Sequence, residues 1–127
     1  MIVGIGVDLC EIARIERALE GPTGARFRAR VFTDGEQSYC ERRRRNRFES
    51  YAARFAAKEA AMKALGTGWG EGVAWRDLEV VSAEGRGPRL LVHGRAAAIA
   101  ERAGIVQWHL ALSHSTTTAM AWVIGER

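Results

Sequence analysis

Apolar residues recur at helical spacing over about residues 46–65, and this is the strongest pattern in the chain. At about 100° per residue, four large side chains project in nearly one direction: Phe48, Tyr51, Phe55 and Met62. The pattern predicts one long helix that ends at Gly66. Glu59 lies close to the centre of this apolar stripe, where an ionised carboxylate is costly unless a cation or hydrogen-bond donors compensate it.

Shorter patterns precede this helix. Residues 2–7 are apolar and contain two glycines, which predicts a short buried strand whose backbone comes close to another element. Apolar residues at helical spacing predict a second helix over about residues 11–20, which the Gly-Pro dipeptide behind it ends. Two short helical segments are expected within residues 23–45, around an N-cap at Thr33.

The C-terminal half carries a glycine-rich loop and then segments with β-type alternation. The expected elements are a hairpin of residues 78–83 and 89–93, an Ala-rich helix over 94–103, and strands over 106–113 and about 117–124. Alternation puts four residues on one face of the first of these strands: Val106, Trp108, Leu110 and Leu112. The patterns predict an α+β fold with residues 1–127 as a single domain, helices packing on a mainly antiparallel sheet.

The composition limits the class of protein and its expected location in the cell. The chain has 127 residues, and no run approaches the ~20 apolar residues that would span a bilayer. The apolar N-terminus lacks a basic region and meets Asp8 and Glu11 too early for a signal peptide, so a cytoplasmic protein is predicted. Cys10 and Cys40 have no metal-type spacing and are expected to be free thiols.

The charge balance is basic, with a net charge of +4 and a pI of about 9.7. Lysine occurs only at Lys58 and Lys63, and the other basic residues are arginine. Because arginine grips phosphate with a planar fork of donors, this composition suits a phosphorylated ligand or an acidic partner. The run of residues 42–45 also suits a small basic nucleic-acid-binding domain, although the aromatic sheet motif and zinc module of such domains are absent.

Two carboxylates on separate elements are the first candidate site. Asp8 follows the predicted N-terminal strand, and Glu59 lies on the long helix. Carboxylate oxygens with several waters suit Mg²⁺, whereas the histidines and cysteines form no zinc-type cluster. Structural alternatives stay open: Glu59 could pair with Lys63, its i+4 neighbour, and Asp8 could cap the next helix.

A second candidate site is the segment Leu112-Ser113-His114-Ser115, at the turn between the last two strands. Hydroxyls, an imidazole and turn amides suit phosphate binding, and a polar hairpin turn is the alternative. A Ser-His-Asp hydrolase is disfavoured because no G-x-S-x-G motif is present. Gly4-x-Gly6 is not a dinucleotide fingerprint, since the third glycine is missing.

Three segments in this order resemble the 4′-phosphopantetheinyl transferases: GIGVDLCEIARIE, RFAAKEAAMKALGTG, and LSHS followed by TTTAMAWVI. The length is similar to the small holo-acyl-carrier-protein synthase type. The resemblance implies transfer of the 4′-phosphopantetheine arm of coenzyme A to a serine of apo acyl carrier protein, which releases adenosine 3′,5′-bisphosphate. It further implies a homotrimer with active sites between protomers, with no nucleic-acid or membrane partner. A catalytically silent relative that only docks carrier proteins is an alternative.

The resemblance also implies residue roles. Asp8 and Glu59 would hold Mg²⁺, and Lys63 would neutralise phosphate charge or assist proton transfer. The serine proton would go to Glu59 or to a water that Glu59 orients. The positions that match coenzyme A contacts are Arg45 of the arginine run, Arg54, Lys58, Gly66, Thr67, Gly68 and His114. Arg14 and Arg17, on the exposed face of their helix, would meet the acidic carrier protein.

Overall fold

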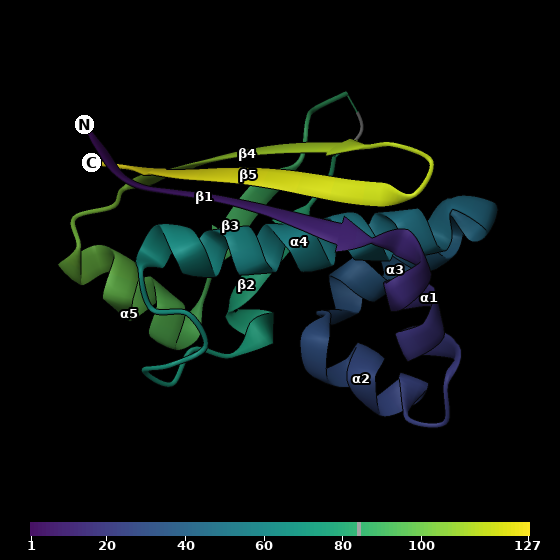
Figure 1. The fold of residues 1–127 in the computed structure, drawn as a ribbon. Coiled ribbons are helices and arrows are strands. Elements are labelled where there is room, and N and C mark those ends of the chain that lie inside the picture. Colours follow the sequence, from purple (N-terminus) through teal and green to yellow (C-terminus); the bar gives the residue numbers. More distant parts are fainter. Residues whose placement is uncertain (84) are drawn as a thin grey trace.

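A long helix packed against one face of a small antiparallel sheet organises the molecule (Figure 1). The structure is a computed structural model that describes residues 1–83 and 85–127. The sheet has the strand order β1-β5-β4, with β1 at Ile2–Glu11, β5 at Thr118–Glu126 and β4 at Gln107–His114. Beneath it runs α4, Arg47–Leu65, which ends at Gly66 in the left-handed conformation. The predicted long helix is therefore confirmed.

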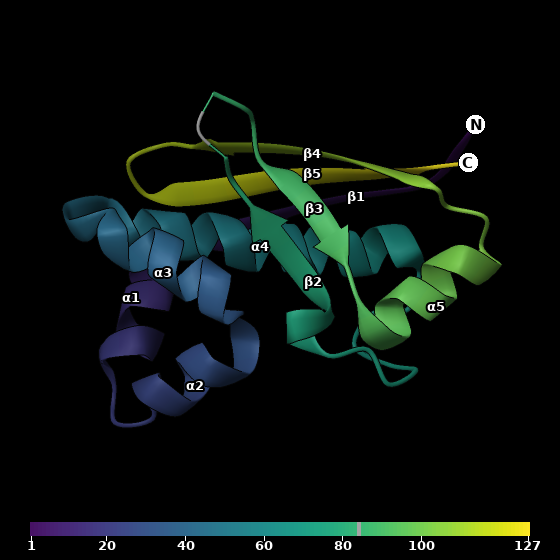
Figure 2. The same cartoon turned by 180° about the vertical axis from the view of Figure 1, so that it is seen from behind.

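The remaining elements surround α4 below the sheet. Helices α1, α2 and α3 gather toward one end of α4 and α5 toward the other, while the hairpin β2–β3 lies on the side away from β1 (Figures 1 and 2). Their bounds are Ile12–Glu20 for α1, Gly24–Val31 for α2, Asp34–Arg42 for α3, Leu78–Val81 for β2, Arg89–Val92 for β3 and Gly94–Arg102 for α5. Short 3₁₀ turns occupy Arg44–Asn46 and Trp75–Asp77. The predicted α+β class is confirmed, and Glu84 of the predicted hairpin turn lies outside the described residues.

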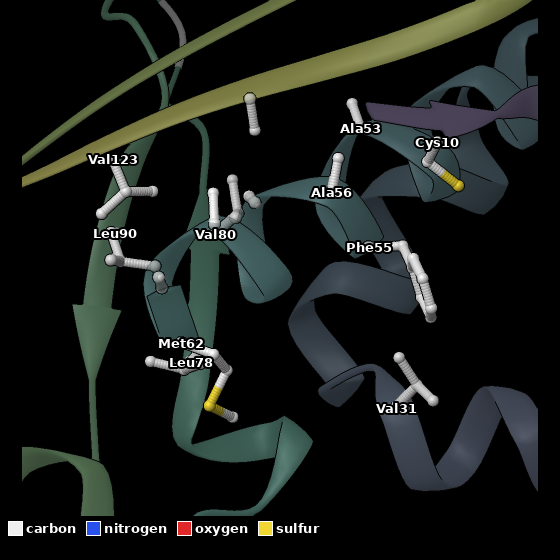
Figure 3. Packing of buried hydrophobic residues seen from close by; sticks show 14 of the residues in the cluster. Cys10, Val31, Ala53, Phe55, Ala56, Met62, Leu78, Val80, Leu90 and Val123 are labelled. Carbon is white, nitrogen blue, oxygen red and sulfur yellow. The ribbon is translucent and has the colours of Figure 1, made fainter. Parts of the chain in front are cut away.

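Residues drawn from several elements form one apolar core around α4. Phe55 points from α4 toward Val31 of α2, and Met62 lies beside Leu78 of β2 (Figure 3).

The N-cap prediction at Thr33 is confirmed, since its hydroxyl accepts a hydrogen bond from the backbone N–H of Glu36 in a capping box. Cys10 and Cys40 are free and buried. Within the described part of the chain, no helix is long and apolar enough to cross a bilayer.

Glycines in β1 set the distance between strand and helix. A Cβ atom on Gly4 would overlap the carbonyl oxygen of Ala64, and one on Gly6 would overlap that of Ala60. The backbone of α4 therefore lies directly on the backbone of β1. This contact explains the two glycines, which the sequence predicted to bring the strand close to another element.

The N-terminal strand differs from its prediction. It extends to Glu11 instead of ending at residue 7, so Asp8 lies within the strand. Ile5, Val7 and Leu9 are exposed, because they point to the outer face of the sheet. The prediction of a buried strand is therefore correct only for the inner face, because α4 covers only one face of the sheet.

Three of the four residues predicted to share an apolar face are partly buried in β4: Trp108, Leu110 and Leu112. The fourth, Val106, precedes the strand and is exposed.

The close contact predicts that Gly6→Ala is strongly destabilising. The added methyl group cannot enter without moving α4 off β1, and we expect a loss of about 3 kcal/mol or more in the free energy of unfolding. Urea denaturation measures this loss. The matched control is Gly87→Ala, where nothing lies within 4 Å of the added Cβ atom. Equal stability of the two variants would contradict the packing described here.

Candidate active site

Asp8 and Glu59 meet where β1 crosses α4. Asp8 points from the inner face of β1 toward the helix, and Glu59 lies next to Ala60, whose carbonyl touches the strand at Gly6. The two carboxyl groups are within hydrogen-bonding reach of each other, and both are only partly buried. The structure therefore brings together, within one protomer, the two acids that the sequence singled out.

The electrostatics of this pair are unfavourable without a further cation. Burial raises the pKa of Glu59 above its usual value, and the neighbouring charge of Asp8 raises this pKa further. The positive charges of Arg14 and Lys63 oppose the shift but do not cancel it. Two carboxylates that repel each other at a partly open position form a site where a bound cation would be stabilised.

Lys63 forms hydrogen bonds with β1 and does not pair with Glu59. Its ammonium group donates to Asp8 Oδ1 at 2.9 Å and to the carbonyl oxygen of Val7 at 2.9 Å. The i+4 pair between Glu59 and Lys63 is therefore not formed. The helix-cap alternative for Asp8 is also wrong, since the N-cap of α1 is Glu11. About half of the Lys63 side chain remains exposed, so its third N–H can reach a ligand.

These groups fit a hard divalent ion with few protein ligands. No cluster of three or more His, Cys, Asp or Glu side chains suited to a metal occurs among residues 1–83 and 85–127. Two adjacent carboxylates at an accessible edge match Mg²⁺, which keeps several waters and commonly bridges to phosphate. The raised pKa of Glu59 points the same way, because the charges of Arg14 and Lys63 do not fully compensate the two acids.

Lys58 does not reach the surface. Its side chain is 0% exposed, and its ammonium group lies 2.8 Å from Glu36 Oε1, which is buried as completely. The same group donates to the carbonyl oxygens of Trp75 and Leu78. Three acceptors use all three N–H donors of an ammonium group. The prediction that Lys58 contacts coenzyme A is therefore wrong for this structure, in which Lys58 joins α4 to α3 and to the start of β2.

Arg54 is buried behind Tyr39 and Ser82, two residues that line a cavity. Its guanidinium group lies 4.1 Å from the centre of the Tyr39 ring and donates to Ser82 Oγ at 3.1 Å, while its Nε has no hydrogen-bond partner. The neighbouring cavity of about 420 Å³ is lined by Tyr39, Arg42, Ser82, Ala83, Arg86 and Pro88. With two arginines and, among the residues that the structure describes, no carboxylate in its lining, this cavity suits an anion. Sequence reasoning missed Tyr39 and Ser82, because only the folded chain brings α3 and the residue after β2 to Arg54. It also missed Arg86, which lines the cavity.

His114 lies at the other edge of the sheet from Asp8. As the last residue of β4, it contacts Glu49 of α4 through Nε2 at 3.1 Å and the carbonyl oxygen of Ser115 through Nδ1 at 3.3 Å. Both partner atoms are hydrogen-bond acceptors. Glu49 was not predicted, and nothing in its spacing from His114 signals the contact.

The other predicted residues lie at the surface. Arg45 is exposed in the 3₁₀ turn Arg44–Asn46, and residues 66–68 form a loop in which Gly66 and Gly68 have positive φ. Arg14 and Arg17 are exposed on α1, and the guanidinium of Arg14 lies 5.5 Å from the centre of the Phe55 ring. One protomer thus groups Asp8, Glu59, Lys63 and Arg14, and it holds His114 and Arg54 apart from them.

Comparison with known proteins decides the family. The family model described as "4′-phosphopantetheinyl transferase superfamily" matches residues 4–121. The chain belongs to this superfamily. It is 52% identical over 126 residues to the holo-[acyl-carrier-protein] synthase of Solibacter usitatus, covering 99% of each chain. The predicted family is confirmed, and the predicted enzyme class, a 4′-phosphopantetheinyl transferase, is confirmed with it.

Solved structures agree with this membership. The crystal structure of holo-[acyl-carrier-protein] synthase from Neisseria meningitidis matches with a TM-score of 0.88 and 31% identity, covering 100% of both chains. The Bacillus anthracis protein, solved in complex with CoA (3′,5′-ADP), matches with a TM-score of 0.79 and 36% identity over 98% of this chain and 96% of that one. These likenesses favour the transferase prediction over a nucleic-acid-binding domain.

The repulsion between the two acids predicts that Glu59→Gln stabilises the protein at pH 8. Because the folded state raises the pKa of Glu59 above its ordinary 4.5, stability is lost as the pH rises through that raised pKa. We expect a gain on the order of 1 kcal/mol in the free energy of unfolding at pH 8, which shrinks toward pH 4. Urea denaturation at both pH values checks this, with Glu101→Gln on the exposed surface of α5 as control. A loss of stability at pH 8 would mean that the acids do not repel each other.

Proposed function

We propose that this chain, acting as a single unit over residues 1–127, transfers the 4′-phosphopantetheine arm of coenzyme A to a serine of apo acyl carrier protein. The products are the holo carrier protein and adenosine 3′,5′-bisphosphate. The observation that carries the proposal is the convergence of Asp8, Glu59 and Lys63 at one accessible edge of α4. Relatives named holo-[acyl-carrier-protein] synthase and a related structure with coenzyme A support it.

Asp8 and Glu59 are the ligands proposed for Mg²⁺. When bound there, the ion supplies positive charge against the pyrophosphate oxygens. Lys63 holds Asp8 in place and directs its remaining N–H toward the same phosphate oxygens. The rate then depends on positioning and on charge stabilisation, as is general for phosphoryl transfer.

The chemical step joins the serine Oγ of the carrier to the phosphorus that bears the pantetheine arm. The bond from this phosphorus to the bridging oxygen breaks, and the bridging oxygen leaves with adenosine 3′,5′-bisphosphate. Glu59, or a water that it orients, accepts the serine proton.

The adenosine bisphosphate end of coenzyme A is proposed to bind the cationic groups away from the carboxylates. Arg45 and the cavity beside Arg54 offer positive charge, His114 offers ring nitrogens for hydrogen bonds, and residues 66–68 offer loop backbone. Arg14 and Arg17 are proposed to bind the carrier protein. Arg14 supports this best, because it is exposed and its charge acts on Glu59.

The assembly is proposed to be a homotrimer built through the outer face of the sheet. Ile5, Val7 and Leu9 of β1 and Trp122 of β5 are exposed on this face, and the β1–β5 register aligns Val7 with Trp122. Contiguous exposed apolar side chains of this kind mark protein interfaces. Trp108 of β4 is not part of this face, because it packs against the core.

Trp122→Glu is expected to dissociate the assembly, because it places a charge at the centre of this apolar face. Sedimentation velocity should show the mass falling from about three times 14.0 kDa toward 14.0 kDa. The matched control is Trp69→Glu, since both tryptophans are 42% exposed and Trp69 lies on the other side of α4. A wild-type protein that sediments as a monomer would contradict the proposal.

The transfer itself is tested by mass spectrometry of apo acyl carrier protein after incubation with the enzyme, coenzyme A and Mg²⁺. We expect the carrier to gain one phosphopantetheine arm, and Asp8→Asn to lower the rate by about 100-fold or more, because the metal loses one of two protein ligands. Glu101→Gln is the control. Mg²⁺ should also raise the Tm of the wild type but not of Asp8→Asn.

Two outcomes speak against these assignments. If the wild type leaves the mass of the carrier unchanged, the chain does not catalyse the transfer. The alternative of a silent relative that only docks carrier proteins would then remain. Full activity of Asp8→Asn would make the acid pair structural.

A further inference from the structure

The inner edge of β2 is paired with side chains instead of with a strand. In the part of the chain that the structure describes, β2 has a strand partner along one edge, β3, and it contacts α3 and α4 on its other side (Figure 2). Residues 78 and 80 direct backbone groups to this inner edge, since alternate residues of a strand bond to opposite edges. Both residues are buried, so these backbone groups need partners within the protein.

The buried ion pair of Glu36 and Lys58 supplies both partners. Glu36 Oε2 accepts a hydrogen bond from the backbone N–H of Val80 at 2.8 Å, and the ammonium group of Lys58 donates to the carbonyl oxygen of Leu78. The carboxylate thus takes the place of a neighbouring strand's carbonyl group, and the ammonium takes the place of its N–H group. Apolar side chains of the same size could fill this space, but they could not bind the edge of β2.

The pair also joins two elements that line the anion cavity beside Arg54. Tyr39 and Ser82, which both line this cavity, come from α3 and from the segment after β2. Glu36 precedes Tyr39 by about one helical turn, and Val80 precedes Ser82 by two residues. The hydrogen bond between Glu36 and Val80 therefore fixes α3 against β2 directly beside the cavity. We call the contacts of the Glu36–Lys58 pair with Val80 and Leu78 the buried joint.

A second connection between α3 and β2 lies beside the buried joint. The hydroxyl of Thr33, the N-cap of α3, donates to Glu79 Oε2 of β2 at 2.7 Å. The backbone N–H of Thr33 donates to Glu36 Oε1 at 2.9 Å. Hydrogen bonds to ionised groups are stronger than those between neutral groups, so α3 cannot slide along β2 without a large loss of bonding.

The buried joint is separate from the acid pair, although Lys58 and Glu59 are neighbours in the sequence. Successive residues of a helix project about 100° apart. Lys58 lies against Glu36 of α3, whereas Glu59 lies against Asp8 of β1. A change at the joint should therefore alter the cavity and leave the acid pair in place.

We propose that Glu36 and Lys58 are positioning residues for the coenzyme A site. They hold Tyr39 and Ser82 at the spacing that the adenosine bisphosphate end of coenzyme A requires, and they do not touch the ligand. This inference rests on the proposed function, because it takes that end of coenzyme A as the occupant of the cavity.

Steady-state kinetics on the full-length double variant Glu36→Gln/Lys58→Met test this role. Both side chains nearly keep their size and no buried charge is left unpaired, so the variant should fold. Glutamine has one acceptor oxygen and cannot bind Thr33 and Val80 through two oxygens, and methionine cannot donate to Leu78. We expect the KM for coenzyme A to rise about 5- to 20-fold, with kcat and the KM for apo carrier protein within about twofold of wild type.

Hydrogen exchange with mass spectrometry gives an independent readout of the joint. The backbone amides of residues 78–82 should exchange faster in the double variant, while those of β1 and β5 keep the wild-type rate. General loss of stability would instead speed exchange in all of these segments.

Two further variants complete the design. Asp34→Asn/Arg76→Met is the matched control, since it removes an ion pair of 3.3 Å that also joins α3 to the segment before β2 but is exposed. Its KM values should stay within about twofold of wild type. Thr33→Val weakens the α3–β2 connection without changing a buried charge, and it should raise the KM for coenzyme A about two- to fivefold. This variant decides the question if the double variant does not fold.

The outcomes separate this role from the proposed function. No transfer by the wild type defeats the reaction and the positioning role together. Transfer by the wild type, with an unchanged KM for coenzyme A in Thr33→Val or in the folded double variant, defeats the positioning role alone. A raised KM for coenzyme A in the double variant without faster exchange at residues 78–82 would mean that Lys58 binds the ligand directly, and it would overturn the inference.

Discussion

The direct contact between the backbones of α4 and β1 is the constraint on which the rest of the structure depends. Gly4 and Gly6 leave no side chain between strand and helix, so the carbonyl groups of Ala60 and Ala64 rest on the strand. Asp8 follows Gly6 by two residues on the same face, and Glu59 directly precedes Ala60. The packing that closes the core therefore also forces the two acids together, and fold and site share one cause.

Because α4 is buried on nearly all sides, the partners of each polar side chain on it indicate whether that side chain has a structural role. Lys58 is satisfied by Glu36 and two carbonyl oxygens, in the way that a buried charge requires. Arg54 is satisfied only in part, since its Nε is unpaired. Glu59 faces another acid, which is the least favourable arrangement of the three. The degree to which each charge lacks compensation therefore separates structural residues from those suited to bind a ligand.

Local patterns in the sequence predicted much of the fold and part of the candidate site. Helical spacing located α4, the capping residue Thr33 located α3, and an acid near an apolar stripe located Glu59. Contacts between distant segments could not be predicted in this way. The family resemblance assigns Lys58 to coenzyme A. Its ion pair with Glu36 could not be predicted, because Glu36 lies on another helix and nothing local shows that their side chains meet in the core. The length of β1 was underestimated because its outward apolar residues have the same composition as a buried strand.

The layout of charges links the proposed assembly to the proposed reaction. Asp8 lies in β1 and His114 in β4, which are the two edges of the sheet with β5 between them, so about 10 Å of sheet separates the two backbones. The helix α4 underlies this sheet, with Glu59 beside Asp8 and Glu49 beside His114. One chain therefore holds the acids proposed for Mg²⁺ and the imidazole proposed for phosphate apart. A coenzyme A molecule that needs both would take them from neighbouring copies, and the apolar outer face of the sheet would then serve catalysis as well as stability.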